Sequence, residues 1–211
     1  MKNRKYNELA EKLEGVYTVE TLCERLKIKR RRAIYIVHKL RKIGYVRTTY
    51  GAGRDRIYYI SRRNKQKGIS YTEIINEVSP IQLASSNPYY IHGRIPSYEE
   101  ALIYALKQKD IRYTIASLIL FRKIKDWNLL YRTAKKEGLV RKIAALYYVA
   151  RKVVRKVRRI PKRFLHLAQK EKKGAFEYIV EPYTSNDYKT IERKWRVHIP
   201  INLSDLEDYS Q

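Results

Sequence analysis

The chain has 211 residues, and 44% of them are apolar, so it can bury one large core or two small ones and is no disordered basic tail. Its 47 Lys and Arg residues outnumber 21 Asp and Glu residues, which gives a formal net charge of +26. The apolar stretch 115–121 is far shorter than the about 20 residues that cross a bilayer, and the single cysteine, Cys23, cannot close an internal disulfide, so we expect a soluble, cytoplasmic protein.

The first 62 residues predict three helices followed by a two-stranded hairpin. Residues 5–14 form the first helix, and Thr18 is a good N-cap for a short second helix with apolar residues at 19, 22, 23 and 26. A third helix begins with the basic residues 29–32 and ends at Gly44, which supplies a C-terminal stop. Strands are then expected at 45–49 and 56–61, joined by the glycine-containing turn YGAG.

This order of elements resembles a known DNA-binding fold. Residues 17–61, YTVETLCERLKIKRRRAIYIVHKLRKIGYVRTTYGAGRDRIYYIS, are similar to the winged helix-turn-helix of archaeal and bacterial transcription regulators. The resemblance implies that the third helix enters a DNA major groove. It also implies that the hairpin, called the wing, lies along a minor groove or the DNA backbone.

The remainder of the chain predicts a helical domain that ends in a hairpin. After a polar linker at 63–70, helical patterns occupy most of the span 71–173, in the segments 71–78, 97–107, 111–123, 126–137, 140–160 and 162–172. Alternating apolar residues at 176–180 and 195–203 predict a β-hairpin over 174–203, and residues 204–211 form an acidic tail. The expected fold class is mainly α with a small β part.

Part of the helical span carries a second resemblance. Residues 83–164, which include the spacing DW…LL…A…GL, are similar to the helical region of AbiEi-type antitoxin and regulator proteins. In that family a small helical region follows a winged helix, and the proteins bind their own promoters. The resemblance therefore implies promoter binding, and it raises a toxin as a further partner.

The basic residues gather in two segments of the chain. Residues 1–67 contain 20 Lys and Arg against 6 acidic residues, and residues 121–173 contain 19 against 3. A large excess of one charge favours a partner of the opposite sign, and nucleic acid fits two basic modules best. An anionic membrane surface fits less well, because no segment pairs a basic face with exposed Trp or Phe.

The third helix and the hairpin form the first candidate interface. Cations at the positively polarised start of a helix are unfavourable unless an anion lies there, and a DNA phosphate is such an anion. Arg can bind a guanine edge through two hydrogen bonds, and Lys or Arg can neutralise phosphates. The alternative is a set of solvated charges without a partner. The residues expected to contact nucleic acid are Lys29, Arg30, Arg31, Arg32, Tyr35, Lys39, Lys42, Arg54 and Arg56.

The predicted helix 140–160 forms the second candidate interface. A helical wheel puts its apolar residues on one side and several cations on the other. Like charges three or four residues apart destabilise a helix, and no Asp or Glu lies between residues 141 and 170 to relieve them. Phosphates along a nucleic-acid backbone would relieve this repulsion. The alternative is a basic face that is solvated and has no partner. The residues expected to contact nucleic acid are Arg141, Lys152, Arg155, Lys156 and Arg159.

Catalysis finds little support in the sequence. The four histidines lack metal-ligand spacing, and the GAG at 51–53 is too short for a phosphate-binding loop, so we expect no enzyme, no cofactor and no metal. We expect a homodimer, because one short helix reads few base pairs. DNA is the favoured partner, and structured or ribosomal RNA is the alternative. The scarcity of thermolabile residues indicates a thermophilic composition.

Overall fold

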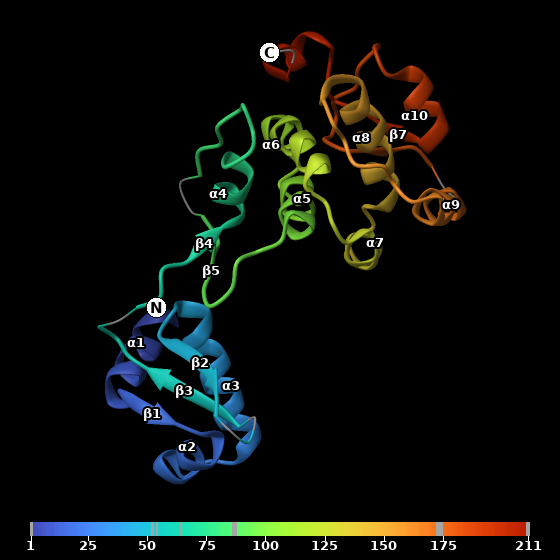
Figure 1. Ribbon diagram of the computed structural model, residues 1–211. Helices are drawn as coiled ribbons and strands as arrows, with labels where there is room; N and C mark the ends of the chain where they lie inside the picture. Colours follow the sequence, from blue (N-terminus) through green and yellow to red (C-terminus); the bar gives the residue numbers. More distant parts are fainter. Residues whose placement is uncertain are drawn as a thin grey trace. The chain divides into compact units, whose positions relative to one another are not determined.

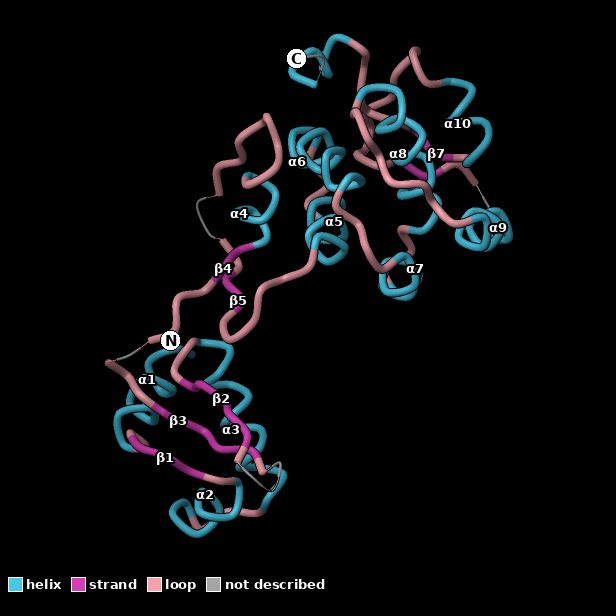
Figure 2. Tube along the Cα trace, in the orientation of Figure 1, coloured by secondary structure: helices cyan, strands magenta, loops and turns pink. Residues whose placement is uncertain are grey.

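The computed structural model describes residues 2–51, 53, 55–63, 65–85, 88–171 and 175–209. Within these residues the chain is mainly helical with small sheets, as the sequence predicts (Figures 1 and 2). It divides into two compact units. The N-terminal unit consists of Met1–Ser70 and Tyr89–Ile95, and the second unit consists of Tyr71–Pro88 and Pro96–Gln211.

Each unit has its own set of elements. The elements of the N-terminal unit are α1 (Lys2–Lys12), β1 (Gly15–Tyr17), α2 (Val19–Leu26), α3 (Arg30–Ile43), β2 (Val46–Tyr50), β3 (Arg56–Ile60), β4 (Ile69–Ser70) and β5 (Tyr90–Ile91). The elements of the second unit are α4 (Tyr71–Asn76), α5 (Tyr98–Lys107), α6 (Ile111–Ser117), η1 (Leu118–Arg122), α7 (Trp127–Lys136), α8 (Val140–Val153), α9 (Lys162–Lys170), β6 (Glu177–Tyr178), α10 (Lys189–Trp195), β7 (Val197–His198) and η2 (Ser204–Tyr209).

In the N-terminal unit, three helices cover one face of an antiparallel sheet whose strand order is β1-β3-β2 (Figure 2). Side chains alternate between the two faces of a strand, so Tyr58 and Ile60 point into the core while Tyr59 between them is exposed. The sequence did not predict the short strand β1, which pairs Val16 with Tyr59. The core of this unit consists of Ala10, Leu13, Val19, Leu22, Ala33, Val37, Leu40, Tyr45, Val46, Tyr58 and Ile60.

Local sequence signals place the ends of α2 and α3 as predicted. The Thr18 hydroxyl accepts a hydrogen bond from the backbone N–H of Thr21, and the Thr21 hydroxyl accepts one from the backbone N–H of Thr18, which forms a capping box. Gly44 ends α3 with φ of 92°, in the left-handed region that glycine adopts at low cost. These caps fix both the start of α2 and the length of α3.

The predicted linker at 63–70 differs from the structure at its C-terminal end. Residues 69 and 70 form β4, which pairs antiparallel with β5, and Ser70 is buried. The N-terminal unit therefore extends to residue 70 and includes residues 89–95 from beyond α4. Single-sequence patterns miss such a pair because a two-residue strand carries almost no periodic signal.

In the second unit, helices pack around α5 and α8, which present fully buried residues such as Leu102 and Ile143. Ser97 and Glu100 form the predicted capping box of α5, and Asp126 caps α7 as predicted. The buried carboxylate of Glu99 accepts hydrogen bonds from the backbone N–H groups of Lys125 (2.7 Å) and Asp126 (2.9 Å). Glu99 thereby fixes the backbone of residues 125 and 126, which precede α7.

The predicted β-hairpin over 174–203 is wrong. Residues 177–178 and 197–198 pair in parallel, and the helix α10 lies between them. Ile191 and Trp195, four residues apart, give α10 its buried face, and the predicted hairpin did not include this helical spacing. Trp195, Val197, Ile199 and Ile201 are buried as the alternation predicts, whereas Leu203 is exposed, and only 197–198 form a strand.

Two further predictions at the C-terminal side are corrected. The helix expected over 140–160 ends at Val153, because Val154 turns to an extended conformation (φ −93°, ψ 125°). The expected acidic tail contains η2, whose Leu206 and Tyr209 are buried. The Tyr209 hydroxyl donates a hydrogen bond to the carbonyl oxygen of Ile115 at 2.7 Å, so this segment is part of the fold.

Candidate nucleic-acid interface

The first turn of α3 presents a row of exposed cations. The buried residues Ala33, Val37 and Leu40 hold one face of α3 against the core, and this leaves its opposite face in solvent. No side chain caps the N-terminus of α3 at Lys29. The residues of this row, all exposed, are Lys29, Arg30, Arg31 and Arg32.

One of these cations has an acidic partner within the unit. Arg30 forms an ion pair with Glu20 of α2. A hydrogen bond from its own backbone lowers the pKa of Glu20; desolvation opposes this, and the Arg30 guanidinium and the Thr18 side chain lower the pKa further. Among the described residues, no ion pair involves Lys29, Arg31 or Arg32. These three charges are available to a ligand.

Further along α3, the exposed face combines an aromatic ring with cations. Tyr35 is 53% exposed, and the Lys39 ammonium lies 5.2 Å from the centre of its ring. Lys42 is exposed one turn later. Desolvation and the charges of Lys42, Arg41 and Lys39 lower the pKa of His38, so at neutral pH this imidazole offers hydrogen bonds and no charge.

Of the two hairpin cations predicted to contact nucleic acid, Arg56 is described by the structure. Arg56 is exposed at the start of β3, and it lines a small hollow of about 250 Å³ together with Arg30, Glu20 and Asp55. The fold therefore brings Arg56 beside the first turn of α3. Arg54, the other cation predicted in the hairpin, lies outside the described residues.

Arg141, expected at the second interface, does not belong to it. Only 6% of this residue is exposed, and its guanidinium pairs with Glu177 of β6 and donates to the carbonyl oxygen of Ala175 at 3.5 Å. Arg141 therefore joins α8 to the segment around β6. The helical wheel for 140–160 placed Arg141 among the exposed cations, because a wheel considers one helix alone. It could not show that residues 175–177 cover this side of α8.

The other four predicted cations are exposed, but they do not share one helical face. Lys152 lies in the last turn of α8, and its ammonium is 5.2 Å from the ring centre of Tyr188. Arg155, Lys156 and Arg159 follow the end of α8, and Lys156 has a positive φ of 57°. Their arrangement is set by an irregular segment and not by a 3.6-residue period.

The structure joins this irregular segment to a second basic loop that the sequence analysis missed. The backbone N–H of Arg158 donates to the carbonyl oxygen of Phe121 (3.2 Å), and its Nε donates to that of Arg122 (3.1 Å). We call the exposed cations of the two segments the basic loops. They are Arg122, Lys123 and Lys125 on one side, and Arg155, Lys156, Arg158, Arg159, Lys162 and Arg163 on the other.

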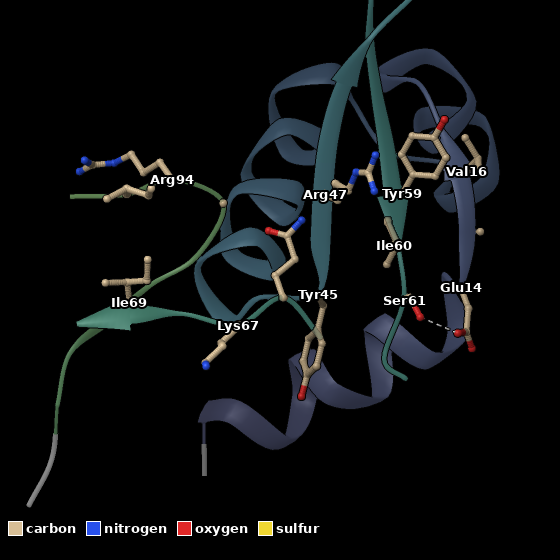
Figure 3. A pocket seen from close by; sticks show the side chains of 14 residues that line it. Glu14, Val16, Tyr45, Arg47, Tyr59, Ile60, Ser61, Lys67, Ile69 and Arg94 are labelled. Atoms are coloured by element: carbon tan, nitrogen blue, oxygen red, sulfur yellow. Dashed lines mark hydrogen bonds between the residues drawn. The ribbon is translucent and has the colours of Figure 1, made fainter. Parts of the chain in front are cut away.

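A third feature is a hollow of about 940 Å³ on the outer face of the N-terminal sheet (Figure 3). Val16, Tyr59 and Arg47 form a row across the three strands, and the Arg47 guanidinium lies 5.9 Å from the Tyr59 ring centre. The rim contains Lys67 and also Glu14, whose carboxylate accepts a hydrogen bond from Ser61. Its mixed charge distinguishes this hollow from the cationic surfaces of α3 and the basic loops.

Two other kinds of site, a metal centre and a membrane span, are absent from the described residues. No group of three or more His, Cys, Asp or Glu side chains is placed to hold a metal ion. None of the described helices is both long and apolar enough to cross a membrane. Comparison of the chain with protein-family models, curated proteins and solved structures gave no match.

Proposed function

We propose that this chain is a DNA-binding protein, a transcription regulator whose N-terminal unit is a winged helix-turn-helix. In this proposal α2 and α3 are the helix-turn-helix, the N-terminal half of α3 lies in a major groove, and the β2–β3 hairpin is the wing. The order of the elements supports it, as does the position of Arg56 beside the first turn of α3.

The observation that carries the proposal is the first turn of α3. Arg31 and Arg32 are exposed and have no ion pair with any described residue, at a helix end where Lys29 makes no side-chain cap. Two adjacent cations at the positive end of a helix dipole raise the free energy of the unbound protein. A phosphate or a guanine edge removes this cost, and Arg is suited to both through paired hydrogen bonds.

We propose that the regulator acts as a homodimer in the cytoplasm and has no catalytic activity. One α3 reads only a few base pairs, and two-fold pairing doubles the length of the recognised site. The basic loops would add backbone contacts, since they carry exposed cations on adjacent segments. The resemblance of the helical region to AbiEi-type regulators fits the same promoter-binding role.

Binding to structured or ribosomal RNA is the second candidate function. The observation that favours it is the position of the basic loops next to Trp127 and Tyr131, two partly exposed aromatic residues of α7. Aromatic rings beside cations suit bases that are not paired in a duplex. Sedimentation of a lysate on a sucrose gradient separates the two functions, because an RNA-binding factor of this kind would travel with ribosomal subunits at low salt.

The proposal is tested by measuring the affinity of Arg31→Gln/Arg32→Gln for duplex DNA selected from genomic fragments. We expect the variant to bind its selected site at least tenfold more weakly and to discriminate less against other sequences. Arg62→Gln/Arg63→Gln is the control, because it removes two exposed charges from the same unit, one of which, Arg62, is paired with Glu11. The backbone N–H of Ser61 donates a hydrogen bond to the carbonyl oxygen of Tyr45, which follows the C-terminus of α3. Arg62 and Arg63 therefore lie near the end of α3 opposite to Arg31 and Arg32.

Two outcomes would overturn this proposal. The first is equal binding of all duplexes by the wild type, with the two variants weakened alike. The second is the absence of any duplex binding in dilute buffer. The mass of the protein–DNA complex, measured by light scattering, tests the homodimer separately.

A further inference from the structure

The second unit contains a groove between α7 and α9 with a volume of about 850 Å³, a size typical of ligand sites. We call it the aromatic groove. Its wall combines rings, cations and a few polar groups. The residues that the argument uses are Lys125, Trp127, Tyr131, Arg132, Arg163 and Phe164.

The rings of the aromatic groove are held in place by packing. Trp127 meets Phe164 edge to face at 5.8 Å and Tyr147 at 6.0 Å between ring centres, while Tyr131 meets Phe164 at 5.7 Å. Trp127 and Tyr131 are four residues apart on α7 and therefore neighbours on one face of the helix. Both are partly exposed, whereas Phe164 beneath them is buried. The groove thus offers fixed aromatic surface to a ligand at little entropic cost.

Exposed cations border these rings. Lys125, Arg132 and Arg163 line the groove, and none of them has an ion pair within the described part of the chain. Asp126, the acidic residue of the lining, accepts hydrogen bonds from the backbone N–H groups of Asn128 (2.9 Å) and Leu129 (2.8 Å). The basic loops supply Lys125 and Arg163 and continue away from the groove. An anionic chain can therefore follow a cationic path that starts at the rings.

From this geometry we propose that the aromatic groove binds unpaired bases of single-stranded nucleic acid. A base stacks on the Trp127–Tyr131 surface while Lys125, Arg132 and Arg163 bind the flanking phosphates. A duplex cannot use the site, because its bases are already stacked on one another and only their edges face the grooves. The inference rests on the proposed function for the role of the basic loops, and it adds a site that does not involve α3.

Trp127 itself reports on the site. The chain has two tryptophans, and Trp195 is fully buried, so a stacked base should quench the emission of Trp127. Short oligothymidylate and oligouridylate would be titrated into the full chain, with excitation at the red edge of the tryptophan band and anisotropy of labelled oligomer followed in parallel. We expect quenching that saturates together with the anisotropy, and none in Trp127→Phe, which keeps a ring for packing. Comparison of the two oligomers shows whether DNA or RNA is preferred.

Two variants and a control test the contacts. Tyr131→Leu should weaken oligomer binding about fivefold or more, since stacking on one ring contributes about 1–3 kcal/mol. Arg132→Gln/Arg163→Gln should weaken binding and reduce the slope of log K against log salt by about 1.4, because each lost phosphate contact on a single strand contributes about 0.7. Lys135→Gln/Lys136→Gln removes two exposed charges from the last turn of α7, outside the groove, and should change affinity less than threefold.

Several outcomes would overturn the inference. They are oligomer binding without a change in Trp127 emission, equal quenching by blunt duplex, and equal quenching by a mononucleotide at the same nucleotide concentration. The last would make the groove a nucleotide pocket. Arg31→Gln/Arg32→Gln keeps this test separate from that of the proposed function, since it should lower duplex affinity and leave quenching by oligomers unchanged. Duplex binding by the wild type, together with no Trp127 response to either single-stranded oligomer, would overturn this inference alone and leave the proposed function standing.

Discussion

Arg141 shows that the same residue type has two different roles in this chain. Its guanidinium is almost fully buried and paired with Glu177, whereas Arg151 on the same helix is exposed. Removing one partner of a buried ion pair costs several kcal/mol, because the other charge is left buried and unpaired. Removing Arg141 costs less than this, because the carboxylate left behind, that of Glu177, is partly exposed to solvent. We therefore expect Arg141 to contribute to stability and to make no contact with nucleic acid.

The first prediction follows from this difference. Arg141→Gln should lower the free energy of unfolding by about 1–3 kcal/mol, because it removes an ion pair and a hydrogen bond between α8 and the segment around β6. Arg151→Gln is the control and should stay within about 0.5 kcal/mol of the wild type. Urea unfolding followed by tryptophan emission measures both, since both tryptophans belong to the second unit. Weaker nucleic-acid binding by folded Arg141→Gln than by Arg151→Gln would contradict the structural role.

The second prediction concerns Tyr209 at alkaline pH. Burial raises the pKa of Tyr209 to about 12, and its hydroxyl donates to the carbonyl oxygens of Ile115 and Ala116. An unfolded tyrosine has a pKa of about 10. From pH 10 to pH 12 the unfolded phenol is therefore ionised while the folded one stays protonated. The unfolded state then binds fewer protons, and the free energy of unfolding falls as pH rises, by up to about 1.4 kcal/mol per pH unit.

Tyr209→Phe should make this fall less steep and should cost about 1 kcal/mol at neutral pH through the lost hydrogen bonds. Tyr183→Phe is the control, because Tyr183 is 53% exposed and should leave the slope unchanged. Urea titrations at a series of pH values, again followed by tryptophan emission, give the slope. An unchanged slope in Tyr209→Phe would show that the phenol is not buried in solution.

At the scale of elements, the sequence predicts the features that depend on a few neighbouring residues. Capping signals at Thr18, Ser97 and Asp126 place the starts of three helices correctly, and Gly44 places the end of α3. The exposed cations of α3 were predicted for the same reason, because its apolar stripe determines which face is buried.

The sequence fails where distant segments decide the outcome. α8 ends at Val153 because the following residues bind elsewhere, Arg158 to Phe121 and Ile160 to the Tyr147 hydroxyl. Neither contact leaves a periodic signal. The basic loops could be predicted only as charge within 121–173, and the pairing of their two segments required the structure.

The third prediction tests the end of α3. Gly44 has φ of 92°, and an added Cβ would lie 2.7 Å from His92 Nδ1 and 3.1 Å from the carbonyl oxygen of Gln66. Gly44→Ala should therefore destabilise the N-terminal unit by about 2–4 kcal/mol, through backbone strain and the close contacts. Amide hydrogen exchange of α3 and β2 is the suitable measurement, because the tryptophans do not report on this unit.

Gly138→Ala separates the two causes. Gly138 also has a positive φ, of 67°, but an added Cβ there would meet no atom within 4 Å. This variant should show the conformational cost alone, about 1 kcal/mol, in the second unit. Equal losses in the two variants would mean that His92 and Gln66 move away from the new methyl group.

For the whole molecule, the charge distribution has a measurable consequence. The N-terminal unit and the basic loops are two separate sources of cations in a chain with a net charge of +26. If one nucleic acid molecule contacts both, the counterions released by the two contacts add. If only one of them binds at a time, they do not. The salt dependence of binding by the full chain therefore counts the surfaces in use.

The fourth prediction makes this test on long duplex DNA. Arg31→Gln/Arg32→Gln and Arg155→Gln/Arg159→Gln should each reduce the slope of log K against log salt by about 1.8, because each phosphate contact contributes about 0.9. Combining all four substitutions should reduce it by about 3.6, since the pairs lie in different units and share no contacts. Arg62→Gln/Arg63→Gln should change the slope much less. If the slope for the four-substitution variant were as steep as the slope for a two-substitution variant, the two surfaces would bind DNA alternately. A dimer that uses one DNA-binding surface per chain would then replace the arrangement in which both surfaces bind at once.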